Sequence, residues 1–258
     1  GVAFTSTGTG AGNSSGAMVE ALSAGTPLLH ITGQVESQHL DKNHGYIHEA
    51  RGQLSMLKAV SKAAYRVTSP ETALTIFKEA VRNALTAPTG PVSVEVPIDV
   101  QQAEIVWPED LTALPVDRLL PDLDHIDLLA EKLARTKRPL LWLGGGARHA
   151  SEAAHRLAEL GFSVVTSVQG RGILPEDHHA TLGAYNLYHP VEAFYETCDA
   201  MLVVGSRLRS NETLKYKLKL PSPFYQVDVD PDVHNRPYHP GMLVLGDSQL
   251  VLEALADR

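Results

Sequence analysis

The sequence predicts an α/β protein with two parallel-sheet units. Short apolar runs alternate with amphipathic segments of helical period along most of the 258 residues. Such alternation implies crossover helices and parallel strands. Between residues 106 and 124 a proline- and aspartate-rich stretch without a sustained period interrupts this rhythm. We therefore expect a first unit over residues 1–105, a linker over 106–124 and a second, Rossmann-like unit over 125–258.

The first unit is organised around a glycine-rich turn. Residues Val2 to Thr5 predict a buried strand, which runs into Gly8-Thr9-Gly10-Ala11-Gly12-Asn13 before a helix begins. Asn13 or one of the two serines after it is expected to cap that helix, and Gly25 is expected to end it. A second strand follows over residues 28–32. A turn of this kind can present backbone N–H groups to a ligand, although a tight turn without a ligand explains the same residues.

The remaining elements of the first unit are predicted as its framework. Strands are expected over residues 65–68 and 91–97, with a helix through 56–60 before them. Ser69-Pro70-Glu71 predicts a further helix start, because serine caps, proline suits the first turn and glutamate complements the helix dipole. A polar loop follows the second strand. The histidines of this region, His30, His39, His44 and His48, do not form a compact ligand spacing, so we predict no metal site.

The second unit shows the pattern of a Rossmann-like domain. Strands are expected over residues 139–143, 162–166, 200–204, 224–229 and 242–245, and helices from 125, over 151–160 and 191–197, and from 248. Glycine-rich or polar residues follow the strands at 144–148, 166–175, 205–207 and 228–230, where open α/β sheets bind ligands. Turns in a scaffold domain are the alternative. The first of these loops is not a G-x-G-x-x-G and lacks the acidic partner of a dinucleotide site, which disfavours an NAD dehydrogenase.

Composition excludes several classes of partner. The formal net charge is −8 and the basic residues are scattered, which argues against nucleic acid or an anionic membrane as the main partner. No apolar run approaches the length of a membrane span. Cys198 is the single cysteine, so no disulfide forms within the chain, and a reducing, cytoplasmic compartment fits.

The glycine turn resembles that of the thiamine diphosphate enzymes of the acetolactate synthase type. The similarity lies in Gly8-x-Gly10-Ala11-x-Asn13, followed by Gly33-Gln34-Val35. In that family a Gly-Pro-Gly-Ala-Thr-Asn turn lies beside the aminopyrimidine ring of the cofactor, and Ser-Gly-Gln-Val ends the next strand. This chain departs from the pattern at Thr9 and Gly12. The resemblance implies cofactor-binding roles for Gly8, Gly10 and Asn13.

The same resemblance implies two candidate catalytic residues, Gln34 and His48. The family's loop carries a Phe-Gln-Glu triplet facing the substrate, and Ile47-His48-Glu49 occupies the corresponding place. An imidazole at His48 could hydrogen-bond the carboxylate of a 2-keto acid or transfer a proton near neutral pH. A solvated loop histidine is the alternative.

The second unit resembles the central domain of these enzymes, in which a groove holds FAD in many members. The implied cofactor-binding residues are Gly144, Gly145, Gly146, Thr166, Gly205, Arg207, Asp228 and Asp247. The chain departs from the pattern of flavin-holding members at Arg209 and Ser210. An empty groove or an ADP-like ligand is the alternative.

The resemblance implies an enzyme that uses thiamine diphosphate with Mg²⁺ on a 2-keto acid and assembles as a homodimer or homotetramer. The family's catalytic glutamate lies upstream of the glycine turn and its Gly-Asp-Gly to Asn magnesium motif lies beyond the central domain. We therefore expect this chain to be a segment of a longer polypeptide, inactive alone; a trimmed or processed start would also explain Gly1. A stand-alone nucleotide- or FAD-binding Rossmann module and a non-catalytic scaffold relative remain as other functions.

Overall fold

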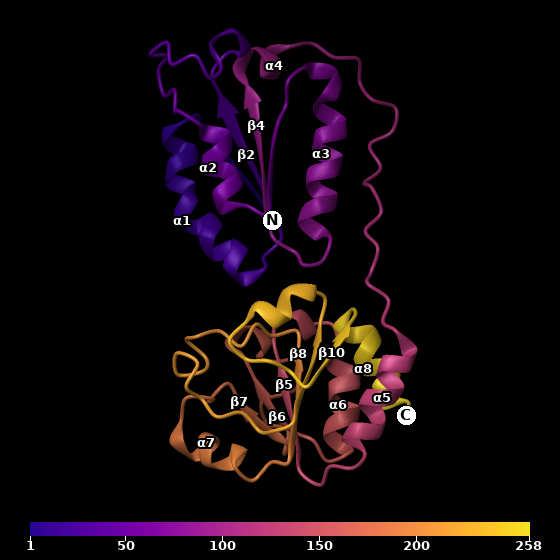
Figure 1. Ribbon diagram of the computed structural model, residues 1–258. Coiled ribbons are helices and arrows are strands. Elements are labelled where there is room, and N and C mark those ends of the chain that lie inside the picture. Colours follow the sequence, from indigo (N-terminus) through magenta and orange to yellow (C-terminus); the bar gives the residue numbers. More distant parts are fainter. The chain divides into compact units, whose positions relative to one another are not determined.

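The computed structural model describes residues 1–258, which form two compact units, Gly1–Asp117 and Arg118–Arg258. Each unit contains one sheet whose strands are all parallel, with helices packed on it (Figure 1). The α/β class with two parallel-sheet units is confirmed. The division between the units falls within the expected linker, and the helix predicted to start at residue 125 begins at Leu123, after Asp122 accepts a hydrogen bond from the Asp124 amide.

The first unit has a four-stranded sheet in the order β1-β2-β4-β3. Its strands are β1 (Val2–Thr5), β2 (Leu28–Gln34), β3 (Ala63–Arg66) and β4 (Pro91–Pro97). Its helices are α1 (Thr9–Ala24), the 3-10 turn η1 (Ser37–His39), α2 (Gln53–Val60), α3 (Pro70–Leu85) and α4 (Ile98–Gln102). Helix α3 covers one face of the sheet, and α1 and α2 lie on the other (Figure 1).

The two faces of this sheet differ in polarity. Toward α3, the valines of β4 at 92, 94 and 96 pack with Ala80 and Ala84. The residues between those valines point to the α1 and α2 side, as do their partners on β2, and they are polar and buried: His30, Thr32, Gln34, Ser93 and Glu95. Because buried polar groups require hydrogen-bond partners, the polar face imposes a network on this unit.

Strand β1 lies at an open edge of the sheet. It was expected to be buried, but Val2 and Phe4 are 60% and 75% exposed. These two residues pair with Leu29 and Ile31 of β2 and so point to the α3 face, yet they are absent from the core that α3 covers. The strand prediction is correct and the burial prediction is wrong, because burial depends on what covers the edge.

Helix α1 begins earlier than expected. Gly8, with φ of 59°, occupies the N-cap position, and the helix starts at Thr9 without a side-chain cap. Gly10 and Asn13 therefore lie inside the helix, and Asn13 is exposed. The positive φ of Gly8 turns the chain before a side-chain cap is needed, so Asn13 and the following serines do not cap the helix. The predicted end is confirmed, since Gly25 adopts the left-handed conformation with φ of 67°.

The second unit, Arg118–Arg258, is called the central unit from here on. It has a six-stranded sheet in the order β10-β9-β8-β5-β6-β7. Its strands are β5 (Pro139–Leu143), β6 (Ser163–Thr166), β7 (Thr181–Gly183), β8 (Ala200–Val204), β9 (Phe224–Asp228) and β10 (Met242–Leu245). Its α-helices are α5 (Leu123–Leu133), α6 (Ser151–Glu159), α7 (His189–Tyr195) and α8 (Ser248–Ala256), with 3-10 turns η2 (Gly145–Ala147), η3 (Val168–Gly170) and η4 (Pro231–Asn235). The short strand β7 was not predicted.

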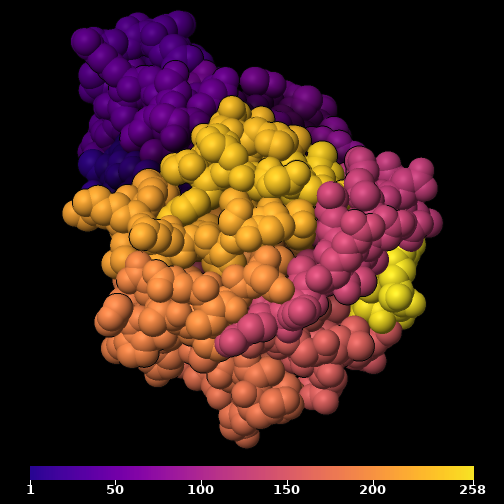
Figure 2. Space-filling view, turned by 60° about the horizontal axis from the view of Figure 1, so that its bottom comes forward, coloured from indigo at the N-terminus to yellow at the C-terminus, as the bar shows by residue number.

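Both faces of β5 and β8, the middle strands of this sheet, are apolar. Helices α5, α6 and α8 cover one face, where Leu141, Leu143 and Leu202 are buried, and α5 lies beside α8 (Figure 2). On the other face Leu140 and Trp142 pack with Tyr195 of α7. The strand order reverses between β5 and β8, which places the switch point of the sheet between the loops that follow these two strands.

Candidate functional site

A cavity lies where strands β1, β2 and β4 end. It has a volume of about 210 Å³ and is lined by Ser6 and Thr7 after β1, Val35 after β2, Ile98 after β4, and the loop residues Tyr46, Ile47 and His48. The carboxyl ends of parallel strands are where α/β sheets bind ligands. The lining residues carry both hydroxyl groups and apolar side chains, the mixture found in small-molecule sites.

The glycine turn borders this cavity, but its bare backbone is covered by the chain itself. A Cβ placed on Gly8 would lie 1.9 Å from the backbone oxygen of His48, and one on Gly10 would lie 2.5 Å from Oγ of Ser6. The cofactor-binding roles expected of Gly8 and Gly10 therefore stay a prediction, and in this structure the atoms nearest to an added Cβ at each glycine belong to the chain itself. The glycines allow the His48 loop and Ser6 to approach, and both of these form part of the cavity wall.

The loop holding His48 places that residue at the cavity with a constrained backbone. His48 is exposed and has φ of 61°, a conformation that non-glycine residues adopt rarely. Glu49 accepts hydrogen bonds from the amides of Gly45 and Tyr46, at 2.9 and 3.1 Å. Of the triplet Ile47-His48-Glu49, the first two residues line the cavity and Glu49 stabilises the loop.

Gln34, the other candidate catalytic residue, belongs to a buried network. Its Oε1 accepts from the Val35 amide at 2.8 Å and its Nε2 donates to Oε2 of Glu95 at 3.2 Å. Gln53 donates to the same Glu95 oxygen at 3.0 Å and to the Gly33 carbonyl at 3.0 Å, while its Oε1 accepts from the Gly8 amide at 2.7 Å. Gln34 therefore helps to hold the strand ends that frame the cavity, and it does not line the cavity.

Arg66 completes this network. Its Nε donates to Oε1 of the fully buried Glu95, and its other nitrogens donate to the carboxylate of Asp41, the closer contact being 2.6 Å. The hydrogen bond from Arg66 lowers the pKa of Asp41. Burial acts to lower the pKa of Arg66, but its hydrogen bonds to Asp41 and Glu95 raise it overall. Sequence reasoning missed Gln53, Glu95 and Arg66; the polar Glu95 in the otherwise apolar end of β4 was the available sign.

The histidines of the first unit do not converge on a metal site. His30 is fully buried and bonds Ser93 Oγ through Nδ1 at 3.0 Å and Thr5 Oγ1 through Nε2 at 2.9 Å, and burial lowers its pKa. Nδ1 of His39 lies 3.1 Å from Nδ1 of His44, and both rings are at the surface. His30 is thus a core residue with satisfied nitrogens.

In the central unit, three of the predicted glycines serve close backbone packing. A Cβ on Gly144 would lie 2.2 Å from the Gly205 oxygen, and one on Gly146 would lie 2.9 Å from the Gly205 Cα. Gly146 also donates to the Gly205 carbonyl at 3.0 Å. The loops after β5 and β8 therefore touch at the switch point. Gly145 faces Gln169, whose Cβ would lie 3.0 Å from an added Cβ.

The carboxyl edge of the central sheet carries a buried hydroxyl, that of Thr166, and a set of charged residues around Asp228 and Arg207. Thr166 ends β6 with its hydroxyl buried and without a hydrogen-bond partner. Asp228 ends β9 and accepts from Arg236 at 3.2 Å, and burial raises its pKa. Partial desolvation, followed by repulsion from Arg236 and Arg209, lowers the pKa of Arg207, while the carboxylates of Asp230 and Asp228, which pair with Arg236, act in the opposite direction. An unpartnered hydroxyl and guanidinium groups are donors of the kind that bind phosphate, although Asp228 and Asp230 already pair with Arg236 at this edge.

Asp247 has a structural role in this edge. Its Oδ1 caps α8 by accepting from the amides of Gln249 and Leu250 at 3.0 and 3.3 Å, and it also accepts from Arg118. Burial acts to raise its pKa, and the hydrogen bond from Arg118 lowers it overall. The carboxylate predicted to bind a cofactor is thus engaged in fixing a helix start.

The fold and the site define an α/β protein with a ligand cavity at a sheet edge and a Rossmann-like second unit. The sequence model described as the thiamine pyrophosphate enzyme central domain matches residues 126–255, and that of the N-terminal TPP binding domain matches residues 1–57. The chain belongs to the thiamine pyrophosphate enzyme family. This confirms the resemblance to thiamine diphosphate enzymes of the acetolactate synthase type.

Similar proteins include one named as a 2-ketoarginine decarboxylase and one named as an acetolactate synthase. The chain is 31% identical over its whole length to the "Probable 2-ketoarginine decarboxylase AruI" of Pseudomonas aeruginosa, covering 46% of that protein. It is 30% identical to the acetolactate synthase large subunit of Corynebacterium glutamicum, covering all of this chain and 42% of the relative. The chain therefore spans less than half the length of these relatives.

A solved structure resembles this chain over nearly its whole length. It is the X-ray structure of a "putative thiamin diphosphate-dependent enzyme" from Mycobacterium smegmatis, with a TM-score of 0.82 and 25% identity. The match covers 99% of this chain and 50% of the other. Among the helices of the present structure, none is both long and apolar enough to cross a membrane.

Proposed function

We propose that this protein is a thiamine diphosphate-dependent enzyme acting on a 2-keto acid, and that the cavity of the first unit receives the aminopyrimidine ring. The observation that supports this most directly is the position of the cavity at the ends of β1, β2 and β4, within the part of the chain that is built like a thiamine diphosphate-binding domain. The relatives named as a 2-ketoarginine decarboxylase and an acetolactate synthase support the substrate class.

The residues that line the cavity would bind different parts of the cofactor ring and the substrate. The hydroxyls of Ser6 and Thr7 would hydrogen-bond the polar edge of the ring, and Val35 and Ile98 would cover its apolar faces. The cofactor, when bound, supplies the nucleophilic carbon and the electron sink that cleavage beside a keto group requires. His48, exposed at the same wall, would hydrogen-bond the carboxylate of the substrate. Mg²⁺ would accompany the diphosphate, and we assign no residue of this chain to it.

Two glycines two residues apart on α1 provide the test of the ring position. A methyl group on Gly10 would displace Ser6 Oγ, which lies 2.5 Å from it, whereas nothing lies within 4 Å of one on Gly12. In the full-length protein we expect Gly10→Ala to weaken equilibrium binding of thiamine diphosphate by about tenfold or more, the scale of one lost polar contact. Gly12→Ala should bind as the wild type does. Equal affinities in all three proteins would refute the position.

Steady-state kinetics test the role of His48. His48→Ala should raise KM for the 2-keto acid while leaving the melting temperature unchanged, since the side chain is exposed. His44→Ala is the matched control, because His44 is an exposed histidine of the same loop outside the cavity lining. If both variants keep the wild-type KM, His48 is a solvated loop residue.

We propose a second ligand for the central unit, an FAD or a related phosphate-bearing nucleotide at the carboxyl edge of its sheet. The unpartnered hydroxyl of Thr166 and the guanidinium groups around Arg207 support it. The purified full-length protein should then carry flavin absorbance, or bind ADP where flavin is absent. Thr166→Val should reduce retention of the nucleotide with little loss of stability, because the hydroxyl has no partner to lose. A colourless protein that binds neither ligand would leave the central unit as a scaffold.

A further inference from the structure

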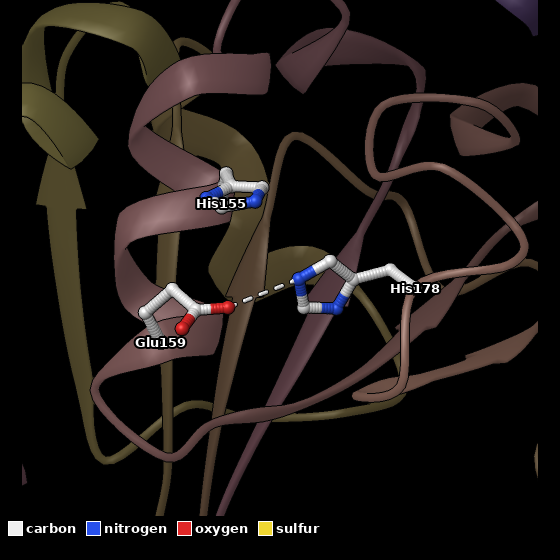
Figure 3. A group of neighbouring side chains, drawn as sticks. All are labelled: His155, Glu159 and His178. Atoms are coloured by element: carbon white, nitrogen blue, oxygen red, sulfur yellow. Dashed lines mark hydrogen bonds and ion pairs between the residues drawn. The ribbon is translucent and has the colours of Figure 1, made fainter.

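Three side chains with metal-binding chemistry lie together on the central unit, outside the sites described above. His155 and Glu159 stand four residues apart on α6, and His178 belongs to the loop between η3 and β7. One ligand atom of each residue lies within 4.8 Å of those of the other two. Figure 3 shows the histidine and the glutamate of the helix on one side and His178 approaching from the facing loop.

The spacing and the donor types suit one transition-metal ion. Residues four apart on a helix lie on the same face, one above the other. Two imidazole nitrogens and one carboxylate oxygen form a three-residue donor set of the kind that binds Zn²⁺. Donor atoms about 2.0–2.1 Å from a tetrahedral zinc are about 3.3 Å apart. The ligand atoms of the three residues, now within 4.8 Å of one another, would each have to move by about 1 Å to reach that separation. Rotation of the exposed side chains of His155 and Glu159 permits this movement.

His178 is the least exposed member of the group. Its side chain is 11% exposed, its ring stacks on His179 with centroids 4.4 Å apart, and its Nε2 lies 3.2 Å from Oε1 of Glu159. Nδ1 accepts from the Ala180 amide at 3.2 Å, so in the metal-free neutral ring the hydrogen is on Nε2. A metal ion at Nε2 would replace that hydrogen and place one on Nδ1, at the cost of the Ala180 contact.

The cations nearest in sequence are engaged elsewhere. Arg156 donates to the Ala256 carbonyl at 2.7 Å and to Asp257 at 2.8 Å. Arg171 pairs with Glu176 through contacts of 2.6 and 2.8 Å. Neither guanidinium therefore neutralises Glu159, which remains available to a metal ion beside the two imidazoles.

We propose that His155, Glu159 and His178 bind one Zn²⁺ ion, which links α6 to the segment before β7. The site lies on the central unit and is independent of the proposed thiamine diphosphate cavity. Three protein donors leave a position for water or a further ligand on the ion.

Isothermal titration of the metal-free purified protein with ZnCl₂, in the presence of excess Mg²⁺, tests the proposal. We expect one Zn²⁺ per chain at this site, with affinity at least about tenfold weaker in His155→Ala and His178→Ala. His179→Ala is the matched control, since this neighbouring ring stacks on His178 but is not part of the group. Glu159→Gln keeps the side-chain size at an exposed position, so it should fold and still lose affinity.

The surface pair His39 and His44 is another place on the chain where two imidazoles lie close enough to bind Zn²⁺. A double variant, His39→Ala with His44→Ala, should retain the site. The proposal is overturned if wild-type protein binds no Zn²⁺, if Glu159→Gln binds as tightly as wild type, or if zinc binding disappears only in the double variant.

Discussion

The two sheets of this protein are built from the same alternation of strand and helix but differ in what they bury. The middle strands of the central sheet are apolar on both faces, with Leu141 and Leu143 of β5 on one side and Leu140 and Trp142 on the other. The first sheet has one apolar face and one that is lined by His30, Thr32, Gln34, Ser93 and Glu95. The buried polar face lies on the side where α2 supplies Gln53 to the network below the cavity.

This difference shows two ways of fixing strand ends. In the first unit, Gln53 accepts from the Gly8 amide after β1 and donates to the Gly33 carbonyl of β2 and to Glu95 of β4. Arg66 of β3 donates to the same carboxylate, so side-chain hydrogen bonds hold the four strand ends together. In the central unit, glycines allow neighbouring loops to pack backbone against backbone at Gly146 and Gly205. The first arrangement depends on charge and hydrogen bonding, and the second depends on the absence of side chains.

The largest effect is expected from Glu95→Ala. It leaves Arg66 without its buried partner, removes the Glu95 acceptor of the Gln34 amide and removes one of the two acceptors of the Gln53 amide, which should lower the free energy of unfolding of the first unit by about 3–5 kcal/mol. Hydrogen exchange of the β4 amides would measure it. Glu79→Ala, which breaks an exposed pair with Arg82 on α3, should cost less than about 1 kcal/mol. If the β4 amides exchange equally slowly in Glu95→Ala and Glu79→Ala, the hydrogen-bond network around Glu95 does not stabilise this unit.

Gly205→Ala should be the next most damaging change. Gly205 has φ of 57° and an added Cβ would lie 2.7 Å from the Gly146 backbone, so strain and overpacking together should cost about 2–4 kcal/mol. Denaturant unfolding, followed by the fluorescence of the buried Trp142, reports on this unit. Gly172→Ala shares the positive φ, at 80°, but meets nothing within 4 Å, and should cost about 1–2 kcal/mol. If Gly205→Ala and Gly172→Ala lower the free energy of unfolding equally, the close backbone packing at Gly205 contributes nothing beyond conformational strain.

A stabilising change is expected on α1. Gly16 lies inside this helix with open space around it, so Gly16→Ala should raise stability by about 0.5–1 kcal/mol through helix propensity. Gly25→Ala, at the left-handed end of the same helix, should lower it. Thermal melting of the two variants against wild type decides the signs, and a destabilised Gly16→Ala protein would contradict the exposure of that face.

The smallest effect concerns acid, and its sign should differ between the units. The pKa of Asp41 is lowered by Arg66 from its ordinary value of 3.8, so its stabilisation is present above that value and is lost as the pH falls through the folded-state pKa. The carboxylate is largely exposed, which limits the effect to less than about 1 kcal/mol.

Asp228 should behave in the opposite way. Burial raises its pKa above 3.8, so its contribution is largest at low pH and is lost as the pH rises through the folded-state pKa. Unfolding free energies of Asp41→Asn and Asp228→Asn, measured against wild type from acid to neutral pH, should therefore differ from wild type with opposite slopes. Parallel slopes would show that these two environments are not the ones described.

The prediction of secondary structure succeeded where the cause is local. The bounds of β4, β5, β8 and β10 follow from apolar runs, the start of α3 from Pro70, and the end of α1 from Gly25. The start of α1 was misplaced because the positive φ of Gly8 reflects its contact with His48, forty residues away. For the same reason the exposure of Phe4 could not be foreseen: it depends on the reach of α3 over the sheet.

The sequence by itself determined the α/β class, the family resemblance and the region in which the cavity lies, because strand and helix periodicity and glycine spacing are properties of neighbouring residues. Only the tertiary structure decided that Gln34 faces Glu95, that Arg118 meets Asp247 and that His155 meets His178. These contacts join residues from separate elements, and their formation depends on sheet order and register, which no local pattern encodes.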